Sequence, residues 1–124
     1  MKKVMFVLAL CVLAGCKPGA DKAVSIGQRE VSAVMKDPDS SKFRNVKFIQ
    51  KDEADDGTVS GYVCGEVNAK NSYGAYAGFS PFMVNLAMKS KGIFSTGVTY
   101  TVNAKEIYSG DDLPGVDYKK NCDL

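Results

Sequence analysis

The spacing of apolar residues changes once along the chain, and the change separates a helical segment from an extended one. From residue 21 to about residue 36, apolar side chains recur at intervals of three and four, as on one face of an α-helix. Asp21 is a candidate N-cap, and Asp37-Pro38 is expected to end the helix because the residue before proline avoids helical angles. Gly27 on this face indicates close packing against a sheet. The predicted apolar face consists of Val24, Gly27, Val31, Val34 and Met35.

Beyond Pro38 the apolar period becomes two, which is typical of β-strands. Turn-forming segments at 52–57, 71–74 and 89–92 separate the extended stretches. The pattern predicts a single α+β domain over residues 21–124, in which one N-terminal helix packs on an antiparallel meander of about four strands. The expected strands are residues 42–50, 58–69, 82–88 and 93–102.

Three features of the chain after Pro38 lead to further predictions. One face of the second expected strand alternates valine with glycine. A helix or an aromatic ring can fill the space over the glycines, and the N-terminal helix is the main candidate. Pro81 indicates a bend or an edge position before the third strand. Residues 103–124 contain Gly110, Pro114 and Gly115 and are expected to form an irregular return held by Cys122.

The first sixteen residues have a different character from the rest. Two lysines precede an apolar run of twelve residues, from position 4 to position 15. A helix of that length reaches about 18 Å, which is too short to cross about 30 Å of bilayer hydrocarbon. The pattern is typical of a secretory signal peptide.

The end of this run, Leu13-Ala14-Gly15-Cys16, resembles the lipobox of bacterial lipoproteins. The resemblance implies that residues 1–15 are a lipoprotein signal peptide and that Cys16 receives a diacylglycerol and a further acyl chain such as palmitate. Residues 16–20 are then the lipidated cysteine and a short tether. The alternative is an ordinary signal peptide cut near Gly15 or Gly19, with Cys16 left as a free thiol or removed. Lys17 after the cysteine resembles lipoproteins sorted to the outer membrane, so we expect a lipid anchor there, facing the periplasm.

Charge and histidine content exclude several classes of function. Removal of residues 1–15 takes two of the 16 basic residues and none of the 14 acidic ones, so the mature chain is electrically balanced. A balanced chain lacks the basic stripe of a nucleic-acid-binding protein, and no nucleic-acid partner is expected. The absence of histidine excludes most catalytic triads and most catalytic zinc sites.

The cysteines predict a disulfide. Cys11 leaves with the leader and Cys16 takes lipid, so an exported chain keeps Cys64 and Cys122 to pair with each other. The alternative is two unpaired thiols, one buried and one in a frayed tail. Two thiols without histidine cannot complete a tetrahedral zinc site. The acidic segment 52–57 also fails as a calcium loop, because Ala54 and Val63 fall where oxygen ligands are required. We therefore expect no metal and no cofactor.

Residues 68–79 combine amides, one lysine and aromatic rings separated by small residues, which is typical of an adaptable contact surface. The alternative is a hairpin turn in which the asparagines satisfy backbone groups and the rings close the end of the core. The candidate partner-binding residues are Asn68, Lys70, Asn71, Tyr73, Tyr76 and Phe79.

Two motifs carry a resemblance. Residues 37–46, DPDSSKFRNV, and residues 64–79, CGEVNAKNSYGAYAGF, resemble a group of small exported proteins of proteobacteria and their prophages. The resemblance implies a bacterial envelope setting and a shared fold, and it brings no catalytic residue with it.

These observations favour a non-enzymatic binding or structural module of the envelope, with an envelope protein as partner and an oligomeric state left open. A second hypothesis is a small inhibitor or superinfection-exclusion factor that blocks an enzyme or a phage component. A third is a glycan hydrolase that uses Glu66, for which the sequence places no second acid.

Overall fold

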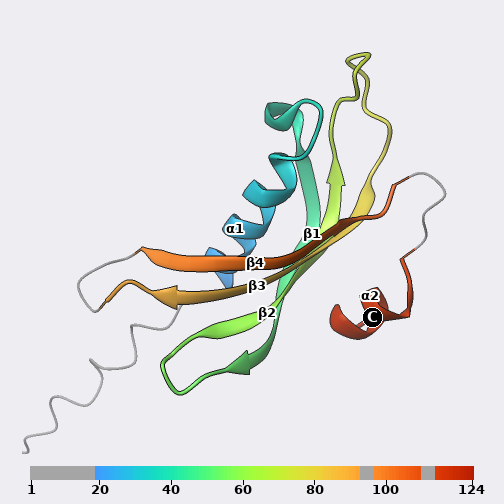
Figure 1. The fold of residues 1–124 in the computed structure, drawn as a ribbon. Coiled ribbons are helices and arrows are strands. Elements are labelled where there is room, and N and C mark those ends of the chain that lie inside the picture. Colours follow the sequence, from blue (N-terminus) through green and yellow to red (C-terminus); the bar gives the residue numbers. More distant parts are fainter. Residues whose placement is uncertain (1–18, 93–96, 110–113) are drawn as a thin grey trace, which may run out of the picture.

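The computed structural model of this chain describes residues 19–92, 97–109 and 114–124, and the statements below concern these residues. The four strands form one sheet in the order β1-β2-β3-β4, with every neighbouring pair antiparallel (Figure 1). The predicted α+β meander with one main N-terminal helix is therefore confirmed. Within the described part of the chain, no helix is both long and apolar enough to cross a bilayer. The elements are α1 (Ala20–Ser32), the 3₁₀ turn η1 (Pro38–Ser40), β1 (Lys42–Glu53), β2 (Val59–Asn68), β3 (Ser80–Ser90), β4 (Val98–Ile107) and α2 (Val116–Asn121).

Helix α1 covers one face of the sheet and is shorter than its apolar pattern predicts. It ends at Ser32: the amides of Val34 and Met35 bond to carbonyls three residues back, and Val34 is 54% exposed. The prediction of Val34 in the core is wrong because the helix has already ended there. Asp21 is also not the N-cap: Gly19 is, and Asp21 lies in the first turn, where its charge favours the helix dipole. The buried residues of α1 are Ala23, Ile26, Gly27 and Val31.

Helix α1 packs closely on the sheet at Gly27, as the sequence predicts. A Cβ atom at position 27 would lie 2.6 Å from Cγ1 of Val63, a fully buried residue of β2. The helix does not fill the space over the other β2 glycines, however. The backbone of Ile49 in β1 occupies the space beside Gly61, and the side chain of Val46 occupies the space beside Gly65. That part of the prediction is wrong, because the bulged edge strand reaches these positions first.

The last two strands differ from the predicted ones. Strand β4 runs to Ile107 rather than ending at 102, because Asn103 is an extra residue opposite β3 and breaks the alternation there. Residues 93–96, which the prediction also placed in this strand, lie outside the described residues. Pro81 is neither at an edge nor at a bend: it is the second residue of the inner strand β3 and pairs with Glu66. Its carbonyl still accepts a hydrogen bond from the amide of Tyr108. Because the proline nitrogen carries no hydrogen, the sheet loses only one backbone donor here.

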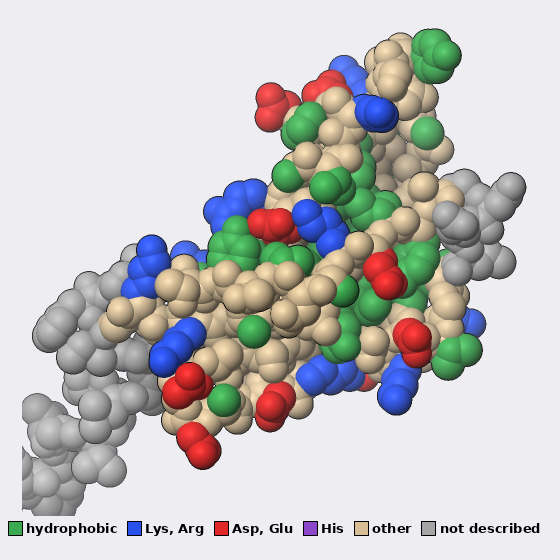
Figure 2. All heavy atoms as spheres, in the orientation of Figure 1, with side chains coloured by type: hydrophobic (Ala, Val, Ile, Leu, Met, Phe, Trp, Pro, Cys, Tyr) green, Lys and Arg blue, Asp and Glu red, His purple; other side chains and the backbone are tan. Residues whose placement is uncertain are grey.

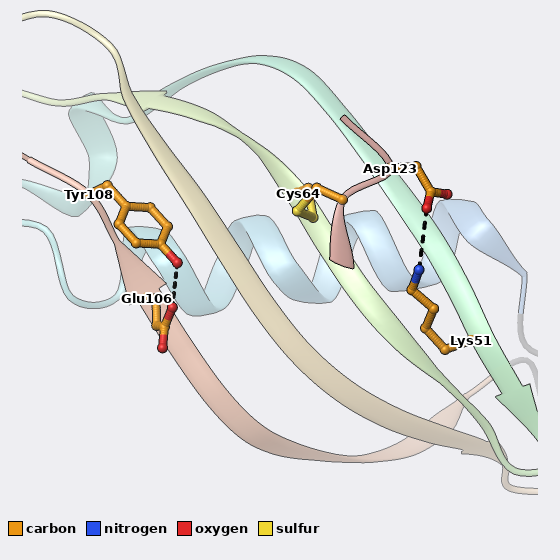
Figure 3. The surroundings of a disulfide bond; sticks show 6 residues. Lys51, Cys64, Glu106, Tyr108 and Asp123 are labelled. Atoms are coloured by element: carbon orange, nitrogen blue, oxygen red, sulfur yellow. Dashed lines mark hydrogen bonds and ion pairs between the residues drawn. A yellow bond between two sulfur atoms is a disulfide. The ribbon is translucent and has the colours of Figure 1, made fainter. Parts of the chain in front are cut away.

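The second face of the sheet carries the short helix α2, where the sequence predicted only an irregular return. Cys122, at the end of α2, forms a disulfide with Cys64 of β2, and their Cα atoms are 5.9 Å apart. The predicted pairing is confirmed. The ring of Tyr118 packs edge-on against Tyr108. Lys51 pairs with Asp123 at 3.4 Å (Figure 3). The molecule thus has three layers, with α1 and α2 on opposite faces.

We predict that Gly27→Ala lowers the free energy of unfolding by about 1 to 3 kcal/mol, because the added methyl group overpacks against Val63. In a Val63→Ala background the same substitution should be neutral or stabilising by about 1 kcal/mol, since only the better helix propensity of alanine remains. Urea unfolding of the four proteins of this double-mutant cycle measures both values. Additive effects would contradict the proposed contact.

We predict that Cys64→Ala/Cys122→Ala lowers the free energy of unfolding by about 4 kcal/mol, because the bond closes a loop with a sequence separation of 58 residues. Reductant should destabilise the wild-type protein by a similar amount and leave the double variant unchanged. Denaturation with and without reductant tests this. Equal stability of the wild-type protein and the double variant without reductant would show that the disulfide does not hold α2 in place.

Candidate functional site

Residues 68–79, called the arm below, form the long connection between β2 and β3. In Figure 1 the arm projects beyond the end of the sheet. An isolated antiparallel bridge joins Lys70 to Tyr76, and a turn between Asn71 and Gly74 closes the tip. Gly74 has φ +77°, a conformation that glycine adopts without strain. The predicted turn at 71–74 is confirmed, and the arm has a defined backbone.

Both asparagines of the arm bond to its backbone. The side-chain oxygen of Asn71 accepts the amides of Tyr73 and Ala75 at 2.9 and 3.2 Å, and that of Asn68 accepts the amide of Gly78 at 3.2 Å. These contacts agree with the alternative interpretation of the two residues, in which they satisfy backbone groups. Their role is to hold the shape of the arm.

The base of the arm is fastened by η1 and β1, which the sequence did not indicate. Ser40 Oγ accepts the amide of Lys70 at 2.8 Å, and the Tyr76 hydroxyl donates to the Ser40 carbonyl at 2.9 Å. The ammonium groups of Lys42 and Lys70 lie 4.5 and 5.9 Å from the centre of the Tyr76 ring. Tyr76 is therefore a brace between the arm and the start of β1.

A second brace joins the arm to the face of the sheet that carries α2. The Arg44 guanidinium carbon lies 3.9 Å from the centre of the Phe79 ring. The same guanidinium donates two hydrogen bonds, of 2.9 and 2.7 Å, to Oε2 of Glu66. Asn45 adds a weaker bond of 3.4 Å to Oε1, from a left-handed backbone (φ +54°) at a register shift of β1. Arg44 and Asn45 belong to a quoted motif, but nothing in one sequence shows that they meet Glu66.

Tyr73 differs from the other predicted arm residues. Its amide is bonded to Asn71, yet its side chain is 94% exposed, whereas Tyr76 is 38% exposed. Figure 2 shows hydrophobic surface at the tip of the arm, and elsewhere on this face acidic and basic side chains are interspersed. Of the six candidate residues, Tyr73 thus offers the largest uncommitted contact surface.

A groove of about 500 Å³ lies between α2 and the bulged part of β1, beside the disulfide. The lining residues with polar side chains are Asn45, Lys47, Glu66 and Tyr118. Burial, with a smaller contribution from the charge of Glu66, raises the pKa of Tyr118 above its ordinary value, so its hydroxyl stays protonated at neutral pH.

The groove does not have the layout of a glycosidase site. Such sites use two carboxyl groups about 5 to 10 Å apart. Glu66 is the one acidic side chain among the described lining residues, and one of its oxygens is occupied by Arg44. The geometry therefore gives the hydrolase hypothesis no support, and that hypothesis remains a prediction.

The acidic segment 52–57, predicted as a turn, is divided: Asp52 and Glu53 pair with β2 as the last residues of β1, and the turn follows them. Asp56 accepts the amide of Thr58 at 2.9 Å and pairs with Lys89 at 3.4 Å. The hydrogen bond from Thr58, and then the charge of Lys89, hold the pKa of Asp56 below its usual value. In the described ranges no three His, Cys, Asp or Glu side chains converge as a metal site would require. The segment has the contacts of a hairpin turn.

Comparisons of this chain with protein-family models, with curated proteins and with solved structures find no match. The geometry of the arm and of the groove is therefore the basis for the functional proposals.

Proposed function

We propose that this protein is a lipid-anchored, non-enzymatic component of the bacterial envelope that presents the arm to a protein partner. The observation that carries the proposal is Tyr73, 94% exposed on a turn whose backbone is fixed by Asn71 and Gly74. A water-exposed aromatic ring has contact area to gain on binding. Tyrosine also loses little conformational entropy, because it has only two side-chain torsions.

The contacts that hold the base of the arm favour a role in binding a protein partner. Association costs free energy for every loop and side chain that must be ordered. Here the Ser40 and Arg44 contacts already hold the base of the arm. A partner would have to order little more than the Tyr73 side chain, which is the arrangement of an interface anchor.

The position of the arm agrees with an anchor at the opposite end of the molecule. Cys16 and the rest of residues 1–18 lie outside the described residues. Helix α1 begins at Ala20, a few residues after the proposed lipid, and leads toward η1, which contacts the base of the arm (Figure 1). Its 13 residues span about 20 Å. With lipid on Cys16, the tip of the arm would point away from the bilayer.

We predict that the full chain, expressed in a Gram-negative host, incorporates labelled palmitate and is extracted with membranes. Cys16→Ser should abolish incorporation, because the thiol is the expected acylation site, whereas Cys64→Ser should keep it. Mass spectrometry of the extracted protein should show an acylated Cys16 and cleavage before it. A soluble mature form with a bare Cys16 thiol would refute the anchor without affecting the arm.

We predict that a photoreactive amino acid at position 73 crosslinks the protein to one partner in intact cells. Tyr73→Ala should weaken the interaction with that purified partner by about 10- to 100-fold, because an anchor aromatic contributes about 1 to 3 kcal/mol. Tyr73→Phe should retain most of the affinity. Val116→Ala, which removes another exposed apolar side chain (81%), serves as the control.

The identity of the captured protein separates the remaining hypotheses. A resident envelope protein supports the binding or structural module, and an incoming enzyme or phage component supports the inhibitor. Equal affinity of Tyr73→Ala and wild type would remove the arm as the binding surface.

A further inference from the structure

We propose that the groove between α2 and the bulge of β1 binds a short zwitterionic peptide, of two or three residues, by its two charged ends. This site is separate from the exposed tip of the arm and does not depend on the function proposed for it. The groove has a volume of about 500 Å³, within the range of sites that enclose small ligands. Its lining includes the Cys64–Cys122 disulfide, which offers apolar surface to a side chain, whereas the side chain of Val46 packs against the core under α1.

The groove is held open by contacts from three sides. The disulfide joins α2 to β2, and the Lys51–Asp123 pair joins the last residues to β1 (Figure 3). The Tyr108–Tyr118 ring contact joins α2 to the residue that follows β4. These three attachments leave α2 little freedom to collapse into the space beside it. A preformed pocket loses less free energy on binding than one that must open.

Glu66 can receive a ligand ammonium group. Arg44 occupies its Oε2 with two short hydrogen bonds, which fixes the carboxylate plane. The other oxygen, Oε1, accepts only the 3.4 Å bond from Asn45. A carboxylate oxygen can accept two hydrogen bonds, so Oε1 has capacity left on the side of the groove.

Lys47 can receive a ligand carboxylate. It lines the groove opposite Cys64 in the strand register, diagonally across from Glu66. In the described part of the chain no ion pair or hydrogen bond engages its ammonium group, and none joins it to Glu66 within 4 Å. Lys47 and Glu66 therefore do not pair with each other: Glu66 is paired with Arg44 through Oε2, and Lys47 has no counter-ion among the described residues. A molecule with both charges can add its ammonium group at Oε1 and its carboxylate at Lys47.

Tyr118 supplies a third polar contact. The residue is 7% exposed and lines the groove, and its hydroxyl has no hydrogen-bond partner among the described residues. Because this hydroxyl is not among the fully buried side-chain atoms without a partner in the described residues, it is accessible from the groove. Because Tyr118 stays protonated near Glu66, its hydroxyl is a donor, and a ligand carboxylate is the acceptor that matches it.

Other ligand classes fit this set of groups less well. A phosphate would meet one lysine and be repelled by Glu66, and a neutral sugar would leave Lys47 without a counter-ion. A peptide of two or three residues supplies a carboxylate for Lys47 and an ammonium group for the second oxygen of Glu66, and places a side chain beside the disulfide. Its ammonium group would lie at Glu66 and its carboxylate between Lys47 and Tyr118.

The test uses the ¹⁵N-labelled full chain in detergent micelles, titrated with the dipeptide Ala-Ala and followed by NMR. We expect saturable shifts of the Val46, Gly65 and Tyr118 amides. N-acetyl-Ala-Ala and Ala-Ala-amide, which each lack one charge, should bind at least tenfold more weakly. Because these three probes are compared on the wild-type protein, the result does not depend on any variant folding.

Variants test which side chains bind the dipeptide. Tyr118→Phe keeps the ring contact with Tyr108 and should weaken Ala-Ala binding three- to tenfold, and Lys47→Met should weaken it at least tenfold. Lys89→Met, which removes a lysine paired with Asp56 on the β1–β2 turn, should have no effect. No saturable shift, shifts away from the groove, or equal binding of the three probes would overturn the proposal. None of these outcomes affects the proposed binding of a protein partner through Tyr73.

Discussion

Successive side chains of β2 point to opposite faces of the sheet, and this constraint decides where both helices and both candidate sites lie. Val63 is directed to the face on which α1 packs, and its contact with Gly27 sets how closely the helix approaches. Cys64, the next residue, is directed to the other face and holds α2. Glu66 follows on the same face as Cys64 and reaches the groove. A shift of β2 by one residue would exchange all of these partners.

The arm and the groove share one side chain, Arg44. Its guanidinium stacks on Phe79 at the base of the arm and donates both hydrogen bonds to Glu66 beside the groove. An exposed ion pair stabilises a protein by little, and this one has 53% of the arginine side chain exposed. The value of the pair lies in geometry instead: the two hydrogen bonds fix the guanidinium plane over the ring, so the arm and the carboxylate are positioned together.

Local signals in the sequence were sufficient for the elements that depend on local physics. The change of period from about 3.6 to two located α1 and the strands, and counting the available thiols identified the Cys64–Cys122 bond. Periodicity failed where pairing with another strand overrides it. Asn103 shifts the alternation of β4 because the register with β3 requires an extra residue there. Ser40 and Arg44 were missed because their partners, Tyr76 and Glu66, lie 36 and 22 residues away and no spacing rule joins them.

Strand β1 lies at an edge of the sheet, where unpaired backbone groups invite association with other strands. Two register shifts interrupt it, and Lys47 and Lys51 are among the charged residues along it. Bulges and lysines are the usual means of protecting such an edge. The first shift also places Asn45 in a left-handed conformation beside Glu66 and brings Val46 against Gly65. The irregularity that protects the edge therefore also builds the wall of the groove. A straight β1 would lose both, which is a physical reason for an asparagine at a position where most side chains are strained.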